Sequence, residues 1–152
     1  MNWIAANADR EQTMGRLPGI GVQFQRLYAS FYRLPQLPPE IVEMCRLRLA
    51  QLHRSEADFA LEEYPLASDR REQLQHWHRA ASFSAGERAC LELAEVYAMD
   101  CGAVTDAQAD AVKEHFGEAG LVALLQALGV FDGFIRLGLI WRAAPVGGRQ
   151  HD

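Results

Sequence analysis

The sequence has no run of lysine or arginine, and basic residues are in the minority overall. Its 15 lysine and arginine residues are outnumbered by 20 aspartate and glutamate residues, which gives a formal net charge of −5. A nucleic-acid-binding protein needs a basic surface to neutralise phosphates. We therefore expect no nucleic-acid partner.

The sequence also lacks a Cys-x-x-Cys pair and any cysteine–histidine spacing that is typical of a metal site. Its three cysteines, Cys45, Cys90 and Cys101, are far apart and odd in number. A structural zinc site is not expected from this pattern, and reduced thiols suit a cytoplasmic protein. The N-terminal residues have neither a basic segment nor an apolar core of a signal peptide. Nothing in the sequence indicates a metal or another cofactor.

What the sequence does contain is a series of amphipathic segments. Hydrophobic residues make up 49% of the 152 residues and charged residues 23%, which is ordinary for a packed globular domain. Apolar residues recur at helical spacing in most of the chain, and no segment alternates as a strand would. We predict an all-α fold of six to seven helices. The helices are expected at residues 19–34, 40–53, 55–66, 70–81, 84–99, 106–116 and 118–141.

We expect one domain over residues 1–152. Its core should run from about residue 19 to residue 145, with residues 1–16 and 146–152 peripheral. The last helix is long enough to span a membrane, but Gln126, Asp132 and Arg136 would be costly in hydrocarbon. We therefore predict a buried core or subunit-interface helix and no membrane association. Because this helix is apolar on several faces, we also predict a homo-oligomer.

The most informative stretch is residues 39–64. It reads as two helices with a break near His53, and the first helix carries Glu43. In the second helix, Ser55, Asp58 and Glu62 recur at i, i+3 and i+7, so they should share one face. The stretch therefore predicts that several polar groups converge at a junction between two helices.

This stretch and the helices after it resemble the carboxymuconolactone decarboxylase superfamily, which includes the alkylhydroperoxidase-D (AhpD) proteins. The peroxidase branch has the spacing Glu-x11-Cys-x2-Cys-x3-His. Glu43 falls on the glutamate, Ser55 and Asp58 fall on the cysteines, and Glu62 falls on the histidine. The resemblance implies a helical bundle that forms oligomers. It also implies that thiol peroxidase chemistry is absent, because serine cannot cycle between thiol and disulfide.

The decarboxylase branch also lacks the cysteine pair and has an acidic–aromatic–x–x–His pattern. Asp58 and Phe59 match the first two positions, and Glu62 replaces the histidine. The usual proton carrier near neutral pH is therefore missing from this position.

Each candidate catalytic residue also has a structural explanation. Ser55 and Asp58 form an [ST]-x-x-[DE] capping box, and Glu62 could be a solvated helix residue. Glu43 could pair with Arg46 at i+3 or be enclosed by apolar neighbours. His53 could interact with the C-terminal end of its helix, or reach Glu43 or Ser55 in space.

Three functions remain open from the sequence. The first is non-redox acid–base chemistry of the lyase or isomerase type on a small organic acid, lactone or carbonyl compound, with Glu43 as the acid or base. In this reading Ser55, Asp58 and His53 would position the substrate. The second is a non-catalytic, oligomeric protein that binds a small molecule or acts as a scaffold. The third is residual oxidant defence through one of the cysteines.

Overall fold

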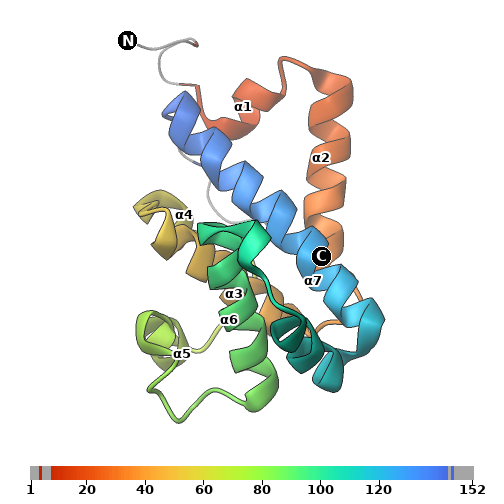
Figure 1. Ribbon diagram of the computed structural model, residues 1–152. Helices are drawn as coiled ribbons and strands as arrows, with labels where there is room; N and C mark the ends of the chain where they lie inside the picture. The colour runs from red at the N-terminus through yellow and green to blue at the C-terminus, as the bar shows by residue number, and fades with distance from the viewer. Residues whose placement is uncertain (1–3, 5–7, 144, 146–152) are drawn as a thin grey trace.

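The computed structural model describes residue 4, residues 8–143 and residue 145, and the secondary structure of this part of the chain consists of helices, with no strand (Figure 1). The predicted all-α fold is confirmed. The α-helices are α1 (Arg10–Met14), α2 (Pro18–Ser30), α3 (Pro39–Leu52), α4 (Glu56–Ala60), α5 (Ser68–Gln73), α6 (Ala85–Met99) and α7 (Asp106–Trp141). Three short 3-10 helices connect them: η1 (Phe31–Arg33), η2 (Leu74–His76) and η3 (Cys101–Ala103).

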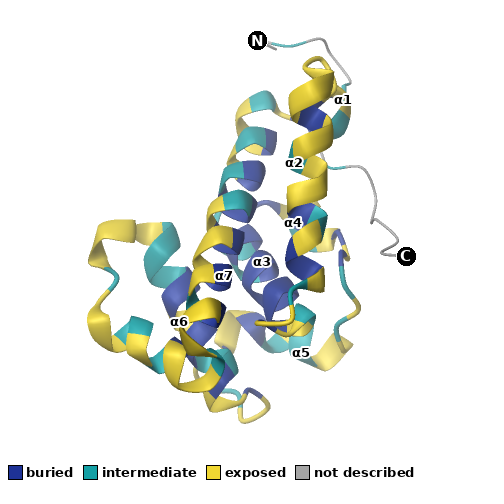
Figure 2. Cartoon of the chain, turned by 90° about the vertical axis from the view of Figure 1, so that its right-hand side faces the viewer, coloured by how far each residue is buried: buried dark blue, intermediate teal, exposed yellow. Residues whose placement is uncertain are grey.

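Helix α3 forms the centre of the bundle. Most of its residues are buried, and it packs against both α6 and α7, as the inward-facing dark blue ribbon in Figure 2 shows. Its side chains Met44, Leu47 and Leu49 have no exposed surface. Two of the buried residues in α3 are charged, Glu43 and Arg46. The buried side of this helix is therefore apolar apart from one charged pair.

The ends of the later helices are set by local sequence signals. Ser84 and Glu87 form a capping box at the start of α6, and Thr105 and Gln108 form another at the start of α7. In each box the side-chain oxygens accept hydrogen bonds from backbone amides that have no partner within the helix. Gly117 interrupts α7 with φ 68° and ψ 178°, a conformation that essentially only glycine adopts. The predicted end of a helix at residue 116 therefore appears as this break.

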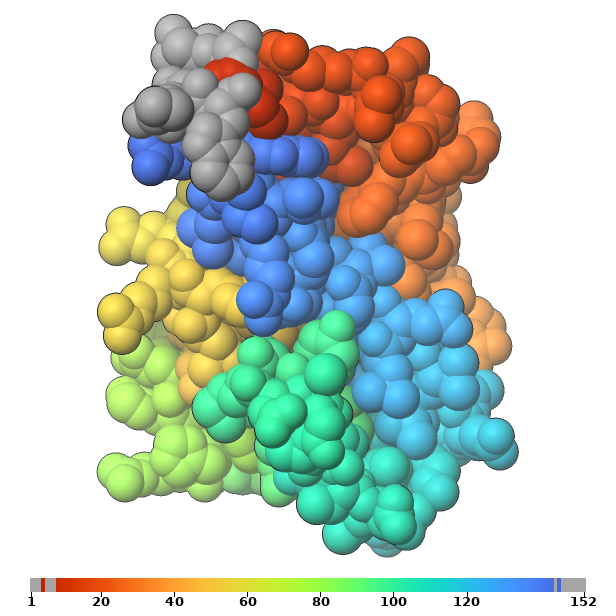
Figure 3. Space-filling model, turned by 45° about the horizontal axis from the view of Figure 1, so that its top comes forward, coloured from red at the N-terminus to blue at the C-terminus, as the bar shows by residue number. Residues whose placement is uncertain are grey.

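Helix α7 is long and apolar enough to cross a membrane by length and composition alone, but half of its most apolar stretch is buried inside the fold. It packs against α3 and α6, and its residues Leu124, Leu128 and Phe131 are almost completely enclosed. In Figure 3 its C-terminal half crosses one face of the molecule beside α1 and α2. Helix α7 is thus a core helix of the bundle with one face at the surface.

The described part of residues 1–16, which we predicted to be peripheral, docks on the bundle. Helix α1 packs on α2 and α7, and the side chain of Arg10 is completely buried. Asp9 and Gln12 form a capping box that starts the helix. Residues 146–152, also predicted to be peripheral, lie outside the described residues.

Candidate functional site

Glu43 lies on the buried side of α3 with none of its surface exposed. Its Oε2 accepts hydrogen bonds from the Tyr32 hydroxyl (2.7 Å) and from Nε of Arg46 (2.9 Å). Its Oε1 accepts from Nη2 of Arg46 (2.7 Å) and from the backbone amide of Glu63 (3.2 Å). Glu43 and Arg46, one turn apart, therefore form a bidentate ion pair, the geometry that suits a guanidinium and a carboxylate best.

The guanidinium of Arg46 also binds the chain that follows α3. Its Nη1 donates to the carbonyl of Asp58 (2.8 Å) and its Nη2 to the carbonyl of Leu61 (2.6 Å). Burial by itself would lower the pKa of Arg46, but the hydrogen bonds and charge of Glu43 outweigh burial and hold this pKa well above its ordinary value. Arg46 is thus a permanent cation that joins α3, α4 and the loop after α4.

These bonds explain why α4 is shorter than the predicted helix over residues 55–66. In a longer helix the carbonyl of Asp58 would accept from the amide four residues later. Here it accepts from Arg46, and Leu61 is already extended (φ −70°, ψ 133°). Glu62 therefore does not share a helix face with Ser55 and Asp58, and its side chain is exposed. The predicted convergence of these residues is correct for Ser55 and Asp58 and wrong for Glu62.

Ser55 and Asp58 form a second buried cluster with Arg10. The Ser55 hydroxyl donates to Oδ2 of Asp58 (2.6 Å), and Nη1 of Arg10 donates to Oδ1 (2.6 Å). The Arg10 guanidinium also lies over the ring of Phe134, 3.8 Å from its centroid. Ser55 caps α4 as the sequence predicts. The charge of the Asp58 carboxylate is balanced by Arg10, 48 residues earlier in the sequence.

His53 reaches neither Glu43 nor Ser55. Its Nε2 lies 2.5 Å from Oδ1 of Asp132, whose Oδ2 accepts from Nε of Arg136 (2.7 Å). Asp132 and Arg136 thus form an i, i+4 ion pair on α7. His53 is therefore joined to α7 and separate from the Glu43 cluster.

Tyr32 was not identified from the sequence. Burial, and then the nearby Tyr28 and Glu43, raise the pKa of its hydroxyl well above the ordinary value. The hydroxyl therefore stays protonated and donates a hydrogen bond to Glu43. Arg10 was also missed, because its partner is 48 residues away in the sequence. The Asp9–Gln12 capping box is the one local signal that could have placed Arg10 in a helix.

A pocket of about 470 Å³ opens beside Ser55, between the C-terminal end of α3, α4 and η2. We call it the Ser55 pocket. This volume is in the range of small-molecule sites. The residues that line it are Arg48, Ala50, Gln51, Arg54, Ser55, Glu56, Phe59 and Gln75. Ser55 thus belongs to both the buried cluster and an accessible pocket, whereas Glu43 does not line it.

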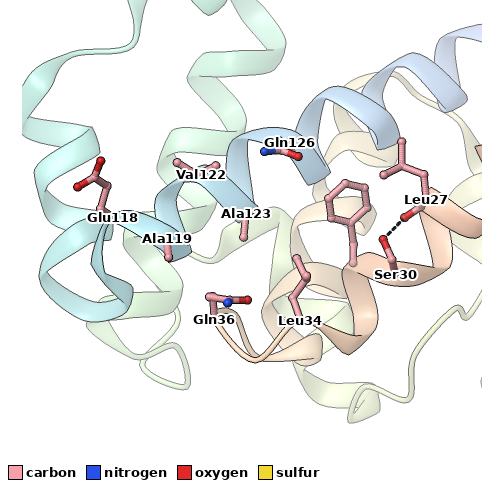
Figure 4. Close-up of a pocket in the computed structure, with 10 residues that line it drawn as sticks. Leu27, Ser30, Leu34, Gln36, Glu118, Ala119, Val122, Ala123 and Gln126 are labelled. Atoms are coloured by element: carbon pink, nitrogen blue, oxygen red, sulfur yellow. Dashed lines mark hydrogen bonds between the residues drawn. The ribbon is translucent and has the colours of Figure 1, made fainter.

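A second concavity of about 570 Å³ lies between α2 and the part of α7 after Gly117 (Figure 4). Its walls are mainly apolar and include Leu27, Leu34 and Val122. Its polar lining residues are Ser30, Gln36, Glu118 and Gln126, and none of the candidate residues lies there. Within residues 8–143, no group of three or more His, Cys, Asp and Glu side chains could hold a metal ion.

No protein-family model matches this chain, and no curated protein matches it. Solved structures do. The debrominase Bmp8, as a Cys-to-Ala variant in complex with 2,3,4-tribromopyrrole, has a TM-score of 0.76 and 12% identity, over 90% of this chain and 76% of that one. Apo Bmp8 has a TM-score of 0.75 and 14% identity over the same shares.

An Agrobacterium tumefaciens protein of unknown function, ATU0492, for which an AhpD-type role in antioxidant defence is suggested, is also similar. Its TM-score is 0.73 and its identity is 15%, over 87% of this chain and 94% of that one. These identities are low, and the agreement concerns the course of the backbone. The chain therefore has the AhpD-like helical fold that the sequence resemblance implies.

Proposed function

We propose that this chain is a non-redox, AhpD-like protein that binds a small organic molecule in the Ser55 pocket and does not use Glu43 for catalysis. The observation that carries the proposal is the complete burial of the Glu43 side chain. Its side chain is fully buried, and both carboxylate oxygens already accept hydrogen bonds. A general acid or base must come within hydrogen-bond reach of the substrate. Glu43 would have to leave Arg46 to do so.

The residues at the family's cysteine positions support the same proposal. Ser55 and Asp58 bear no thiol, and Asp58 is paired with Arg10. Two of the three cysteines in the chain are buried. Burial raises the pKa of the Cys45 thiol well above its ordinary value and that of Cys90 to about 12. Because the thiolate is the reactive form, these two thiols are unsuited to peroxide reduction.

The Ser55 pocket favours binding as the remaining role. It combines an aromatic wall, Phe59, with polar groups on Gln51, Arg54 and Ser55. Six of its eight lining residues are polar or charged, which suits a small ligand that carries polar groups as well as a ring. The debrominase with the same fold binds a halogenated pyrrole. We therefore choose small aromatic and heteroaromatic compounds as the first ligands to test.

The test has two parts. Purified protein is mixed with cumene hydroperoxide and a dithiol donor, and we expect no turnover above the protein-free reaction. ¹⁵N-labelled protein is then titrated with aromatic and heteroaromatic compounds, and we expect shifts of the amides of Gln51, Ser55 and Phe59. Steady hydroperoxide reduction that Cys101→Ala abolishes would instead support thiol chemistry. Shifts confined to residues outside the Ser55 pocket would overturn the proposed site.

A further inference from the structure

Arg54 occupies a backbone position that normally belongs to glycine. It follows the last turn of α3 with φ 55°, in the left-handed region. The amide of Arg54 donates to the carbonyl of Gln51 (3.0 Å), and the amide of Ser55 donates to that of Ala50 (2.9 Å). This pair of bonds defines a Schellman motif, in which the left-handed residue is most often glycine because a Cβ atom is strained there.

The side chain at this strained position lines the Ser55 pocket. Arg54 is exposed, and within residues 8–143 no carboxylate lies at ion-pair distance from it. The other lining arginine, Arg48, is held at the wall by Glu95 (2.7 Å) and by the side chain of Gln51 (2.9 Å). Among residues 8–143, Arg54 is therefore the lining arginine whose guanidinium has no carboxylate at ion-pair distance.

The surroundings add positive potential and an aromatic surface. The guanidinium of Arg71 lies 4.9 Å from the centroid of the Phe59 ring and donates to the Phe59 carbonyl. The one acidic lining residue, Glu56, is the first residue of α4, where a carboxylate is favoured by the unpaired amides of the helix end. Glu56 thus has a structural reason to be there, whereas an arginine at position 54 adds backbone strain.

We infer that Arg54 binds the acidic group of the ligand, and that the ligand is a small planar organic anion such as an aromatic carboxylate. A guanidinium can hold a carboxylate with two parallel hydrogen bonds. Phe59 offers a surface for the ring of the same molecule. This inference rests on the proposed function and specifies the ligand class for the Ser55 pocket.

The test uses benzoate and pyrrole-2-carboxylate, with benzamide and pyrrole-2-carboxamide as neutral counterparts. Binding is followed by NMR titration and calorimetry. We expect both acids to shift the backbone amide resonances of the Ser55 pocket. Each acid should bind at least tenfold more tightly than its carboxamide counterpart. Arg54→Gly should weaken the binding of both acids at least tenfold and leave the affinity for the two carboxamides unchanged. The same variant should raise the melting temperature, because glycine relieves the strain at this position.

The chain supplies a matched control in Arg142. It is also exposed, also ends a helix, and also has a left-handed backbone (φ 54°), but it does not line the Ser55 pocket. Arg142→Gly should raise the melting temperature as Arg54→Gly does, without changing the affinity for benzoate. Equal loss of benzoate affinity in both variants would overturn the role of Arg54.

Glu56→Gln distinguishes an anionic ligand from other classes. Removing this nearby negative charge should tighten benzoate binding about twofold or more, since like charges in the pocket repel. Weaker benzoate binding in Glu56→Gln would contradict the inference. If the carboxamides bind in the pocket and the acids do not, the assignment of an anionic ligand fails while the proposed function stands. If neither the acids nor the carboxamides shift the backbone amide resonances of the pocket, both the ligand class and the proposed function fail.

Discussion

At the scale of single residues, Glu43 shows how burial decides a role. The family spacing and the apolar neighbours both select this residue, and the structure encloses it. Yet a buried carboxylate with a bidentate arginine has its charge already matched. A pair of this kind adds little net stability compared with apolar residues, but loss of one partner leaves a buried charge without compensation.

We therefore expect Glu43→Gln to destabilise the protein strongly. The glutamine keeps the shape of the side chain but leaves the charge of Arg46 unmatched in the core. The free energy of unfolding should fall by about 3–5 kcal/mol, measured by urea denaturation at pH 7. The control is Glu114→Gln on the exposed surface of α7, which should change it by less than about 0.5 kcal/mol. Equal stability of the two variants would contradict the buried ion pair.

The buried thiols predict a loss of stability at alkaline pH. Burial raises the pKa of Cys90 to about 12, with a further contribution from Glu87, and it also raises the pKa of Cys45. In the unfolded chain a thiol ionises near its ordinary pKa of about 8.5. Above this value the native state binds more protons than the unfolded state. The free energy of unfolding should therefore fall as pH rises from about 8.5 towards 12.

Urea denaturation under reducing conditions at pH 7, 8, 9 and 10 measures this dependence. Removing one buried thiol by Cys90→Ala should reduce the slope above pH 9 by up to about 1.4 kcal/mol per pH unit. The control is Cys101→Ala, which removes an exposed thiol and leaves both buried thiols in place. If Cys90→Ala and wild type had the same slope, the Cys90 thiol would not be responsible.

At the scale of helices, α1 depends on one long-range ion pair. Arg10 is fully buried, and its Nη1 bonds Oδ1 of Asp58. Its Nε and Nη2 have no hydrogen-bond partner in the described part of the chain. Asp58 therefore provides the main compensation for the buried charge that α1 brings into the fold.

A double-mutant cycle tests this dependence. Arg10→Met leaves the Asp58 carboxylate buried without its cation, and Asp58→Leu leaves Arg10, among residues 8–143, with only the more distant carboxylate of Glu11 (4.0 Å). Each variant should cost about 3–5 kcal/mol in urea denaturation. The double variant should lose less than the sum of the two, with a coupling of about 1–3 kcal/mol. Additive losses would show that the two side chains act independently.

Local signals predicted the fold well because most of the helices carry them. The break near His53 and the helix end at residue 116 appear as predicted, and capping boxes at Ser84 and Thr105 start α6 and α7. The errors arise from long-range contacts. The helix that Ser55 caps ends early because Arg46 donates a hydrogen bond to the Asp58 carbonyl. His53 pairs with Asp132, 79 positions away in the sequence. Periodicity cannot reveal such partners.

At the scale of the whole molecule, two helices carry exposed apolar side chains at the surface. Helix α2 and the second half of α7 expose several aliphatic side chains, and the groove in Figure 4 lies between these helices. The exposed residues on the two helices are Ile20, Val22, Leu27, Val122, Leu125, Leu139 and Ile140. An exposed apolar groove of this kind, with Leu27 on one wall and Val122 on the other, is typical of surfaces that contact another protein.

We propose that this surface joins copies of the chain, and light scattering at micromolar concentration should give a multiple of 17.0 kDa. Val122→Glu places a charge in the groove at a side chain that is 46% exposed, so it should dissociate the oligomer without unfolding the subunit. Met99→Glu lies outside this surface, is 74% exposed and should keep the wild-type mass. A wild-type mass near 17.0 kDa would contradict the proposal.

The bonds between the α3 ion pair and the segment after α4 have a consequence for hydrogen exchange. Residues 61–63 have no helical structure, yet the Leu61 carbonyl binds Arg46 and the Glu63 amide binds Glu43. Local opening of this segment would expose the charged pair at the centre of the bundle. The Glu63 amide should therefore exchange with solvent only when the whole domain unfolds, as slowly as amides of the central helix. An irregular segment would then belong to the last part of the protein to open.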